Sequence, residues 1–65
     1  MKTYIIVEAS SKRYHIYNGA GDCVTIVSSR REVITYIDEV LITSSYRTYT
    51  FKYTAAAGTF IVTMY

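Results

Sequence analysis

Residues 29–41, SRREVITYIDEVL, are the stretch in which apolar side chains change from alternating spacing to helical spacing. Ser29 followed three residues later by Glu32 forms a capping box, in which each side chain bonds to a free backbone N–H of the first helical turn. The helix ends near residues 43–45, without a glycine cap. Because β-branched residues lower its intrinsic stability, packing must hold it in place. Its apolar stripe consists of Val33, Ile37, Val40 and Leu41, with Ile34 beside them.

The sequence on both sides of this helix alternates between apolar and polar residues, as half-buried strands do. The segment Asn18-Gly19-Ala20-Gly21-Asp22 is a hairpin turn signal, since Asn and Gly accept the positive φ that tight hairpins need. Shorter turns are expected at residues 9–11 and 55–58. We predict an α+β fold, a single antiparallel sheet of about five strands (β-β-β-α-β-β) with one helix packed on one face. The strands are expected at residues 2–8, 12–17, 23–27, 46–54 and 59–65.

Alternation assigns each side chain of the predicted sheet to one of two faces. The expected helix side carries Tyr4, Ile6, Tyr14, Ile16, Val24, Ile26, Tyr49, Phe51, Phe60, Val62 and Met64. The outer side carries Ile5, Val7, Tyr17, Val27, Tyr46, Ile61 and Tyr65 among threonines. One helix covers only two or three strands. The outer side is therefore either an interaction surface or a shield of tyrosines that simply suit strands.

At 65 residues the chain has room for a single domain, residues 1–65, with one small core. Cys23 is the only cysteine and His15 the only histidine, so neither an internal disulfide nor a four-ligand zinc site can form. No cofactor or metal is expected. The single thiol fits a reducing compartment. The first apolar run ends at Glu8, too short for a secretory signal or a membrane span, so we expect a cytoplasmic protein without membrane contact.

Charges on the predicted helix are placed against its dipole. Arg30 and Arg31 lie in the first turn and Asp38 and Glu39 in the last, the reverse of the favourable arrangement. The two arginines beside free N–H groups form a candidate anion site, although solvated surface charges of this kind are common and cost little.

The groups that catalysis needs are sparse. His15 is expected to be exposed on a strand, and Cys23 to be a small buried apolar residue, as free cysteines usually are. The carboxylates Asp22, Asp38 and Glu39 have no spacing that pairs them. We expect a protein that is not an enzyme.

In its size, in starting directly with a strand, and in its compact strand-and-helix layout, the chain resembles small phage-encoded anti-defence proteins such as anti-CRISPRs. That resemblance is one of overall character and implies a stoichiometric inhibitor that binds a host defence complex in the host cytoplasm. Protein partners are thus the first expectation. Residues 59–65 are expected to form an exposed edge strand, so a homodimer through it or through the sheet face is also considered. The candidate partner-binding residues are Arg13, Tyr17, Arg30, Arg31, Tyr46 and Lys52.

Two further functions remain open from the sequence. The first is nucleic-acid binding, in which scattered cations would neutralise phosphates and Tyr17 and Tyr46 would stack on bases. A formal net charge of +2 is low for such a protein. The second is a structural subunit that self-assembles through strand edges. The candidate phosphate-binding cations are Arg13, Arg30, Arg31, Arg47 and Lys52.

Overall fold

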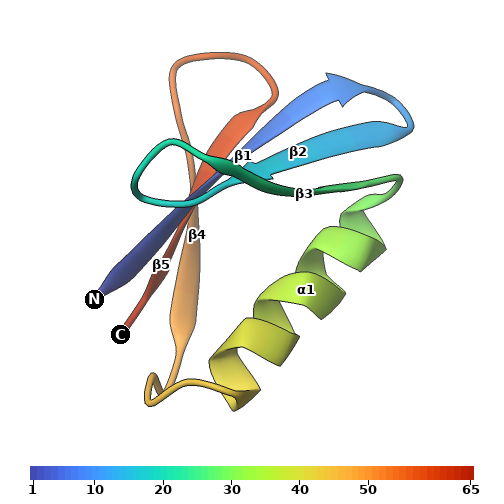
Figure 1. Cartoon of the computed structure of the whole chain (residues 1–65). Coiled ribbons are helices and arrows are strands. Elements are labelled where there is room, and N and C mark those ends of the chain that lie inside the picture. Colours follow the sequence, from blue (N-terminus) through green and yellow to red (C-terminus); the bar gives the residue numbers. More distant parts are fainter.

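The computed structural model describes residues 1–65 and confirms the predicted order of elements. Five strands form one antiparallel sheet, and one helix lies on one of its faces (Figure 1). The elements are β1 (Lys2–Ser10), β2 (Arg13–Tyr17), β3 (Cys23–Val27), α1 (Arg30–Ile42), β4 (Tyr49–Tyr53) and β5 (Thr59–Met64).

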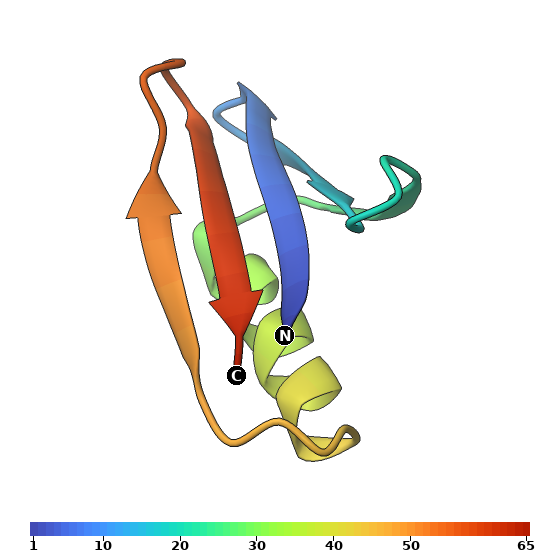
Figure 2. The ribbon, with the colours of Figure 1, turned by 90° about the vertical axis from the view of Figure 1, so that its left-hand side faces the viewer.

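The strand order in the sheet is β3-β2-β1-β5-β4. Strand β1 lies in the centre and pairs with β5 from Lys2–Met64 to Val7–Thr59, so the two ends of the chain lie side by side (Figure 2). The prediction that the last strand is an exposed edge is therefore wrong. The last strand has neighbours on both sides, and the open edges belong to β3 and β4.

The core lies between α1 and the sheet. Val33 and Ile37 of the helix are fully covered by residues from β1, β2 and β5. The sequence prediction of this face is confirmed for all seven sheet residues of the core. These are Tyr4, Ile6, Tyr14, Ile16, Phe60, Val62 and Met64.

Strand β3 differs from the predicted facing. Val27 lies opposite the buried Tyr14, so Val27 is on the helix side, while Ile26 lies opposite His15 on the outer side. Val24 and Ile26, which alternation placed in the core, are both exposed. The pairing register also shifts by a bulge between Ile16 and Tyr17. A shift of one residue moves every side chain of a strand to the other face, and sequence alternation alone does not fix that choice.

Strand boundaries also differ, by two or more residues at two places. Strand β1 continues to Ser10, past the turn expected at residue 9. Strand β4 begins at Tyr49 instead of residue 46, because Tyr46 packs against the core from the connection that follows α1. That connection is held by Arg47, whose backbone N–H donates to the Tyr65 carbonyl at 2.7 Å.

Ser29 caps the start of α1 as predicted, but Glu32 reaches back to Ser28 instead of to the N–H of Ser29. Ser29 Oγ accepts from the Glu32 N–H at 3.2 Å. Glu32 Oε2 in turn accepts from the Ser28 N–H at 2.7 Å. The Ser28 N–H and the Ser28 hydroxyl, which also donates to Glu32 Oε2, hold the pKa of the Glu32 carboxyl below its ordinary value. The helix start therefore already holds a carboxylate of the chain itself, which argues against a further anion bound by its backbone N–H groups. The Arg30 side chain belongs to the lining of a separate cleft.

Candidate binding cleft between α1 and β4

Helix α1 covers one part of its sheet face and leaves another open. It packs closest to β2 and β3 and diverges from β4 toward the upper end of β4 in Figure 1. The consequence is seen in three aromatic residues on the same face. Phe60 of β5 is 7% exposed, whereas Phe51 and Tyr53 of the neighbouring β4 are 38% and 68% exposed.

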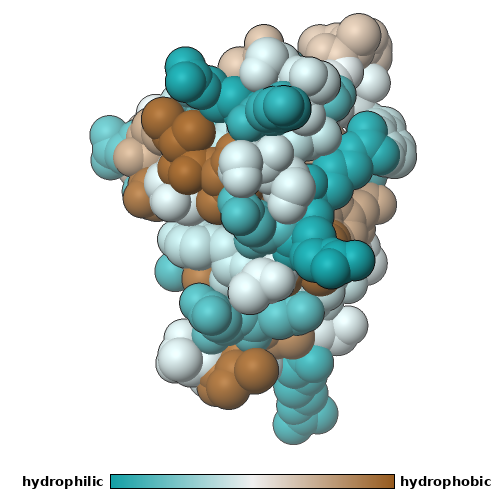
Figure 3. All heavy atoms as spheres, turned by 90° about the vertical axis from the view of Figure 1, so that its right-hand side faces the viewer, coloured by the Kyte–Doolittle hydropathy of each residue, from teal (hydrophilic) through white to brown (hydrophobic).

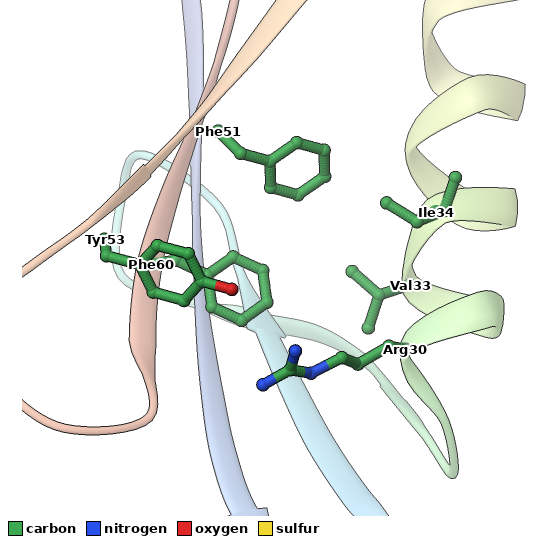
Figure 4. Close-up of a pocket in the computed structure, with 6 residues that line it drawn as sticks. All are labelled: Arg30, Val33, Ile34, Phe51, Tyr53 and Phe60. Atoms are coloured by element: carbon green, nitrogen blue, oxygen red, sulfur yellow. The ribbon is translucent and has the colours of Figure 1, made fainter.

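The uncovered region is a cleft of about 210 Å³ (Figure 4). Phe51 and Tyr53 each have their ring centroid 5.7 Å from that of Phe60, so the three rings form one continuous aromatic wall. Val33 and Ile34 of the helix point toward that wall from the opposite side. The cleft is therefore mostly apolar. Its lining residues are Arg30, Val33, Ile34, Phe51, Tyr53 and Phe60.

A hydrogen bond links β4 to α1 at the start of β4. The Tyr49 hydroxyl at the start of β4 donates to Asp38 Oδ1 of α1 at 2.7 Å. This hydrogen bond, together with burial and the charge of the carboxylate, raises the pKa of Tyr49 above its ordinary value. Asp38 is thus a structural partner rather than a free surface charge, and β4 leaves the helix beyond this point.

The cleft lining contains a single charged residue, Arg30. Its guanidinium points toward the aromatic wall (Figure 4). The neighbouring Tyr14 hydroxyl donates to Glu8 Oε2 at 3.0 Å. The pKa of Arg30 is raised by hydrogen bonding with Tyr14 and by the nearby Tyr53 and Glu8. The exposed Arg30 side chain thus places a positive charge beside the apolar part of the cleft.

Strand β4 adds unpaired backbone groups to this site. Thr48 and Tyr65 exchange N–H···O bonds of 2.9 and 3.4 Å, and Thr54 N–H donates to Thr59 O at 3.1 Å. In an antiparallel pair such bonded positions alternate with positions whose backbone groups point away. The regular register between them therefore directs the N–H and C=O groups of Tyr49, Phe51 and Tyr53 to the open edge, and their side chains face α1.

The structure does not gather the six predicted partner-binding residues into one site. Arg30 lines the cleft, while Arg31 is exposed on the helix outside it. Arg13, Tyr17 and Lys52 belong to the outer sheet face by strand alternation. The placement of Tyr46 on that face is wrong, because its side chain packs against the core.

The outer sheet face is not covered by any element of the chain. Cross-strand pairing forms one row of four residues, Tyr17, Ile5, Ile61 and Lys52. His15 lies beside this row and stacks on Tyr17 with ring centroids 6.3 Å apart. It was expected to be exposed but is half-buried, and its Nε2 is enclosed without a hydrogen-bond partner.

The prediction that Cys23 is buried is wrong, because its side chain is exposed. It lies opposite Tyr17 at the sheet edge, where its thiol contacts the Thr25 carbonyl at 3.6 Å. The outer surface of α1 is different again. Figure 3 shows that side, where hydrophilic and weakly polar atoms predominate and smaller hydrophobic areas lie at the upper left and near the bottom.

Sequence reasoning assigned Phe51 to the helix side but did not identify the cleft. The signal was present: the expected helix side had more aromatic and aliphatic residues than one helix can cover. The surplus was sought on the outer face. In the structure, a part of that surplus lies on the helix face itself, on the edge strand β4.

Comparison of the chain with protein-family models, with curated proteins and with solved structures finds no match. No three His, Cys, Asp or Glu side chains come together in a way that could hold a metal ion. Helix α1 falls short of the length and apolar character needed to cross a membrane.

Proposed function

We propose that the chain is a non-catalytic protein-binding module that holds a segment of its partner in the cleft beside β4. The observation that carries this proposal is that an open apolar cleft and an unpaired strand edge lie side by side. An apolar cleft with three aromatic rings lies open, and the strand that forms its outer wall is an unpaired sheet edge. Addition of a strand to such an edge is a common mode of peptide recognition.

The size of the cleft favours a side chain over a small-molecule ligand. Pockets for small molecules usually measure about 300–1,000 Å³, and this one measures about 210 Å³. Its lining contains a cation and a tyrosine hydroxyl, but no nucleophile beside a base. Such a lining can bind and orient a group but has little means of converting it.

As the finer form of this proposal, the module acts as a stoichiometric inhibitor that occludes a surface of a host defence complex in the host cytoplasm. Its support is the resemblance in size and layout to small phage-encoded anti-defence proteins. A 65-residue chain without an evident reaction centre works most simply by occupying a surface that its target needs.

Nucleic-acid binding is the second candidate. It is favoured by the common placement of Tyr17, Lys52 and Arg13 on the outer sheet face, where an aromatic ring and cations would meet bases and phosphates. The row that joins Tyr17 to Lys52 passes through Ile5 and Ile61, and this apolar interval is less suited to a phosphate backbone.

The proposal is tested by a pull-down with tagged protein from lysate of the native or host cell, with and without nuclease. Two tyrosines of similar exposure supply a matched pair: Tyr53 in the cleft, 68% exposed, and Tyr65 outside it, 54% exposed. We expect a defined protein that persists after nuclease, is retained by Tyr65→Ser and is lost or strongly reduced with Tyr53→Ser.

Two outcomes would contradict it. Recovery that disappears with nuclease would move the function to nucleic acid and to the outer face. Equal recovery by both variants would show that the partner does not use the cleft. Thermal melting of both variants checks that each remains folded, which we expect since both side chains are exposed.

A further inference from the structure

The edge of β4 restricts how a bound segment can lie. Residues Tyr49, Phe51 and Tyr53 present their N–H and C=O groups outward and their side chains toward α1. A residue of an added strand that bonds to Phe51 therefore points its own side chain to the same face. Alternate residues of the segment thus face α1, and those between them face the outer side.

The cleft offers two different environments to those alternate residues. Near Phe51 the opposing helix residue is Ile34, and both side chains are partly exposed and apolar. Near Tyr53 the opposing residue is Arg30. An apolar side chain suits the first environment, and a carboxylate suits the second because a guanidinium binds carboxylates with paired hydrogen bonds.

A second copy of the chain fits this edge less well than a partner with acidic residues. Lys52 lies in the middle of β4, and a symmetric pairing of two β4 strands would bring two Lys52 side chains close together. Lysine on an edge strand is a known means of preventing such pairing. Each copy also carries a formal net charge of +2, so like charges would meet across the interface.

We infer that the partner segment is an extended strand with the pattern Asp/Glu-x-apolar, paired antiparallel with β4. The apolar side chain occupies the cleft beside Phe51 and Ile34, and the carboxylate meets Arg30 beside Tyr53. Antiparallel pairing is the slightly more stable ladder and puts the acidic residue N-terminal to the apolar one, since β4 runs from Tyr49 toward Tyr53. This inference rests on the proposed function and specifies the chemistry of its partner.

The test uses fluorescent synthetic peptides that differ in one feature. The probe is Ser-Thr-Glu-Thr-Phe-Thr-Val-Ser; its counterparts replace Glu by Gln or exchange the positions of Glu and Phe. Affinities are measured by fluorescence anisotropy with the wild type, Arg30→Gln and Arg31→Gln. The two arginines are adjacent in the first turn of α1 and both exposed, but only Arg30 lines the cleft.

The wild type should bind the Glu peptide about two- to fivefold more tightly than either counterpart, as expected for a partly exposed charge pair. Arg31→Gln should keep this preference for Glu over Gln, and Arg30→Gln should lose it. Amide exchange followed by NMR should show new protection at Tyr49, Phe51 and Tyr53 on binding. That readout reports strand addition itself and would not change if Arg30 acted only through the overall charge.

Several results would overturn the inference. It fails if the Glu peptide does not bind, if the peptide with the exchanged order binds more tightly, or if Arg30→Gln keeps the preference for Glu over Gln. Peptide-free dimers that protect the Phe51 amide in sedimentation and exchange experiments would identify a second copy as the occupant. If Tyr53→Ser abolishes capture of a cellular protein while the peptides show no dependence on Arg30, the proposed function stands and this inference alone fails.

Discussion

Phe60 and Phe51 are the same residue type, lie on adjacent strands and face the same side of the sheet, yet only Phe60 is part of the core. Their ring centroids are 5.7 Å apart, but Phe60 is 7% exposed and Phe51 38%. The difference is the position of α1, which covers β5 near Val33 and Ile37 but leaves the Phe51–Tyr53 part of β4 open. Burial in this fold is thus set by the reach of the helix as much as by the apolar character of the strand.

The dimensions of the elements explain why. Strands are about 4.8 Å apart, so five strands span about 19 Å, while a helix with its side chains is about 10–12 Å wide. A single helix of thirteen residues must leave part of the face open. The open part contains Phe51 and Tyr53, which places the binding surface next to the hydrophobic core and continuous with it.

The largest expected effect comes from comparing a carboxylate placed in the core with one placed in the cleft. Ile37→Asp puts an unpaired carboxylate where no solvent reaches, since Ile37 is fully buried. We expect loss of cooperative folding, as even Ile→Ala in a core costs about 2–5 kcal/mol. Phe51→Asp should stay folded, because its carboxylate remains in contact with water.

Circular dichroism melts and proton NMR dispersion of the two variants make the measurement. A cooperative melt of Ile37→Asp close to that of the wild type would mean that the helix does not cover the sheet as described. Unfolding of Phe51→Asp would mean that the cleft belongs to the core and is not available to a partner.

Much of the fold follows from local patterns. The capping box of Ser29 and Glu32 and the alternation of β1, β2 and β5 predict their elements and their buried faces. What alternation cannot provide is the relation between elements. The facing of Val24 and Ile26 depends on a bulge in the pairing with β2, and the role of Tyr46 depends on how the chain returns from α1 to the sheet.

The candidate site was harder to predict for the same reason. Arg30 was identified as a binding residue from its charge, but its neighbours Phe51 and Tyr53 come from a strand about twenty residues later. Their aromatic character suits an ordinary strand equally well. Only the position of α1 over the sheet distinguishes an aromatic residue that fills the core from one that lines a cleft.

A second prediction separates Tyr46 from Lys52, which the sequence had placed together on the outer face. Tyr46→Ala should lower the free energy of unfolding by about 1–3 kcal/mol, since a half-buried ring is removed from the edge of the core. Lys52→Glu should leave it within about 0.5 kcal/mol, as surface substitutions do. Urea unfolding of both variants makes the comparison. Equal free energies of unfolding of the two variants would mean that the Tyr46 side chain does not pack against the core.

A third prediction concerns the beginning of the helix, which fixes where α1 lies over the sheet. Ser29→Ala removes the acceptor of the Glu32 N–H and should cost about 1 kcal/mol. Glu32→Gln should lower stability less, and only above the ordinary carboxyl pKa, because the folded state depresses that pKa and this contribution is lost as the pH falls. Urea unfolding at neutral and acidic pH measures both effects. A Glu32→Gln penalty that is unchanged in acid would exclude the charged cap as its cause.

The smallest effect tests the hydrogen bond that links the start of β4 to α1. Tyr49→Phe removes the hydroxyl that donates to Asp38 at 2.7 Å and should cost about 0.5–1.5 kcal/mol at neutral pH. The pKa of Tyr49 is raised in the folded chain, so the wild type keeps this contribution below pH 10 and loses it as the pH rises through the raised value. The stability difference between the two proteins should therefore shrink in strong alkali, while Tyr36, whose pKa is raised by burial, titrates in both. Urea titrations of the pair from pH 7 to 11 measure that difference. A constant difference would assign the loss to packing. The same variant also tests whether this hydrogen bond sets the position of β4 relative to α1. If it does, Tyr49→Phe should change the NMR shifts of Phe51 and Ile34 more than those of Ile6 and Ile16. Ile6 and Ile16 lie under the helix, where the packing does not depend on β4.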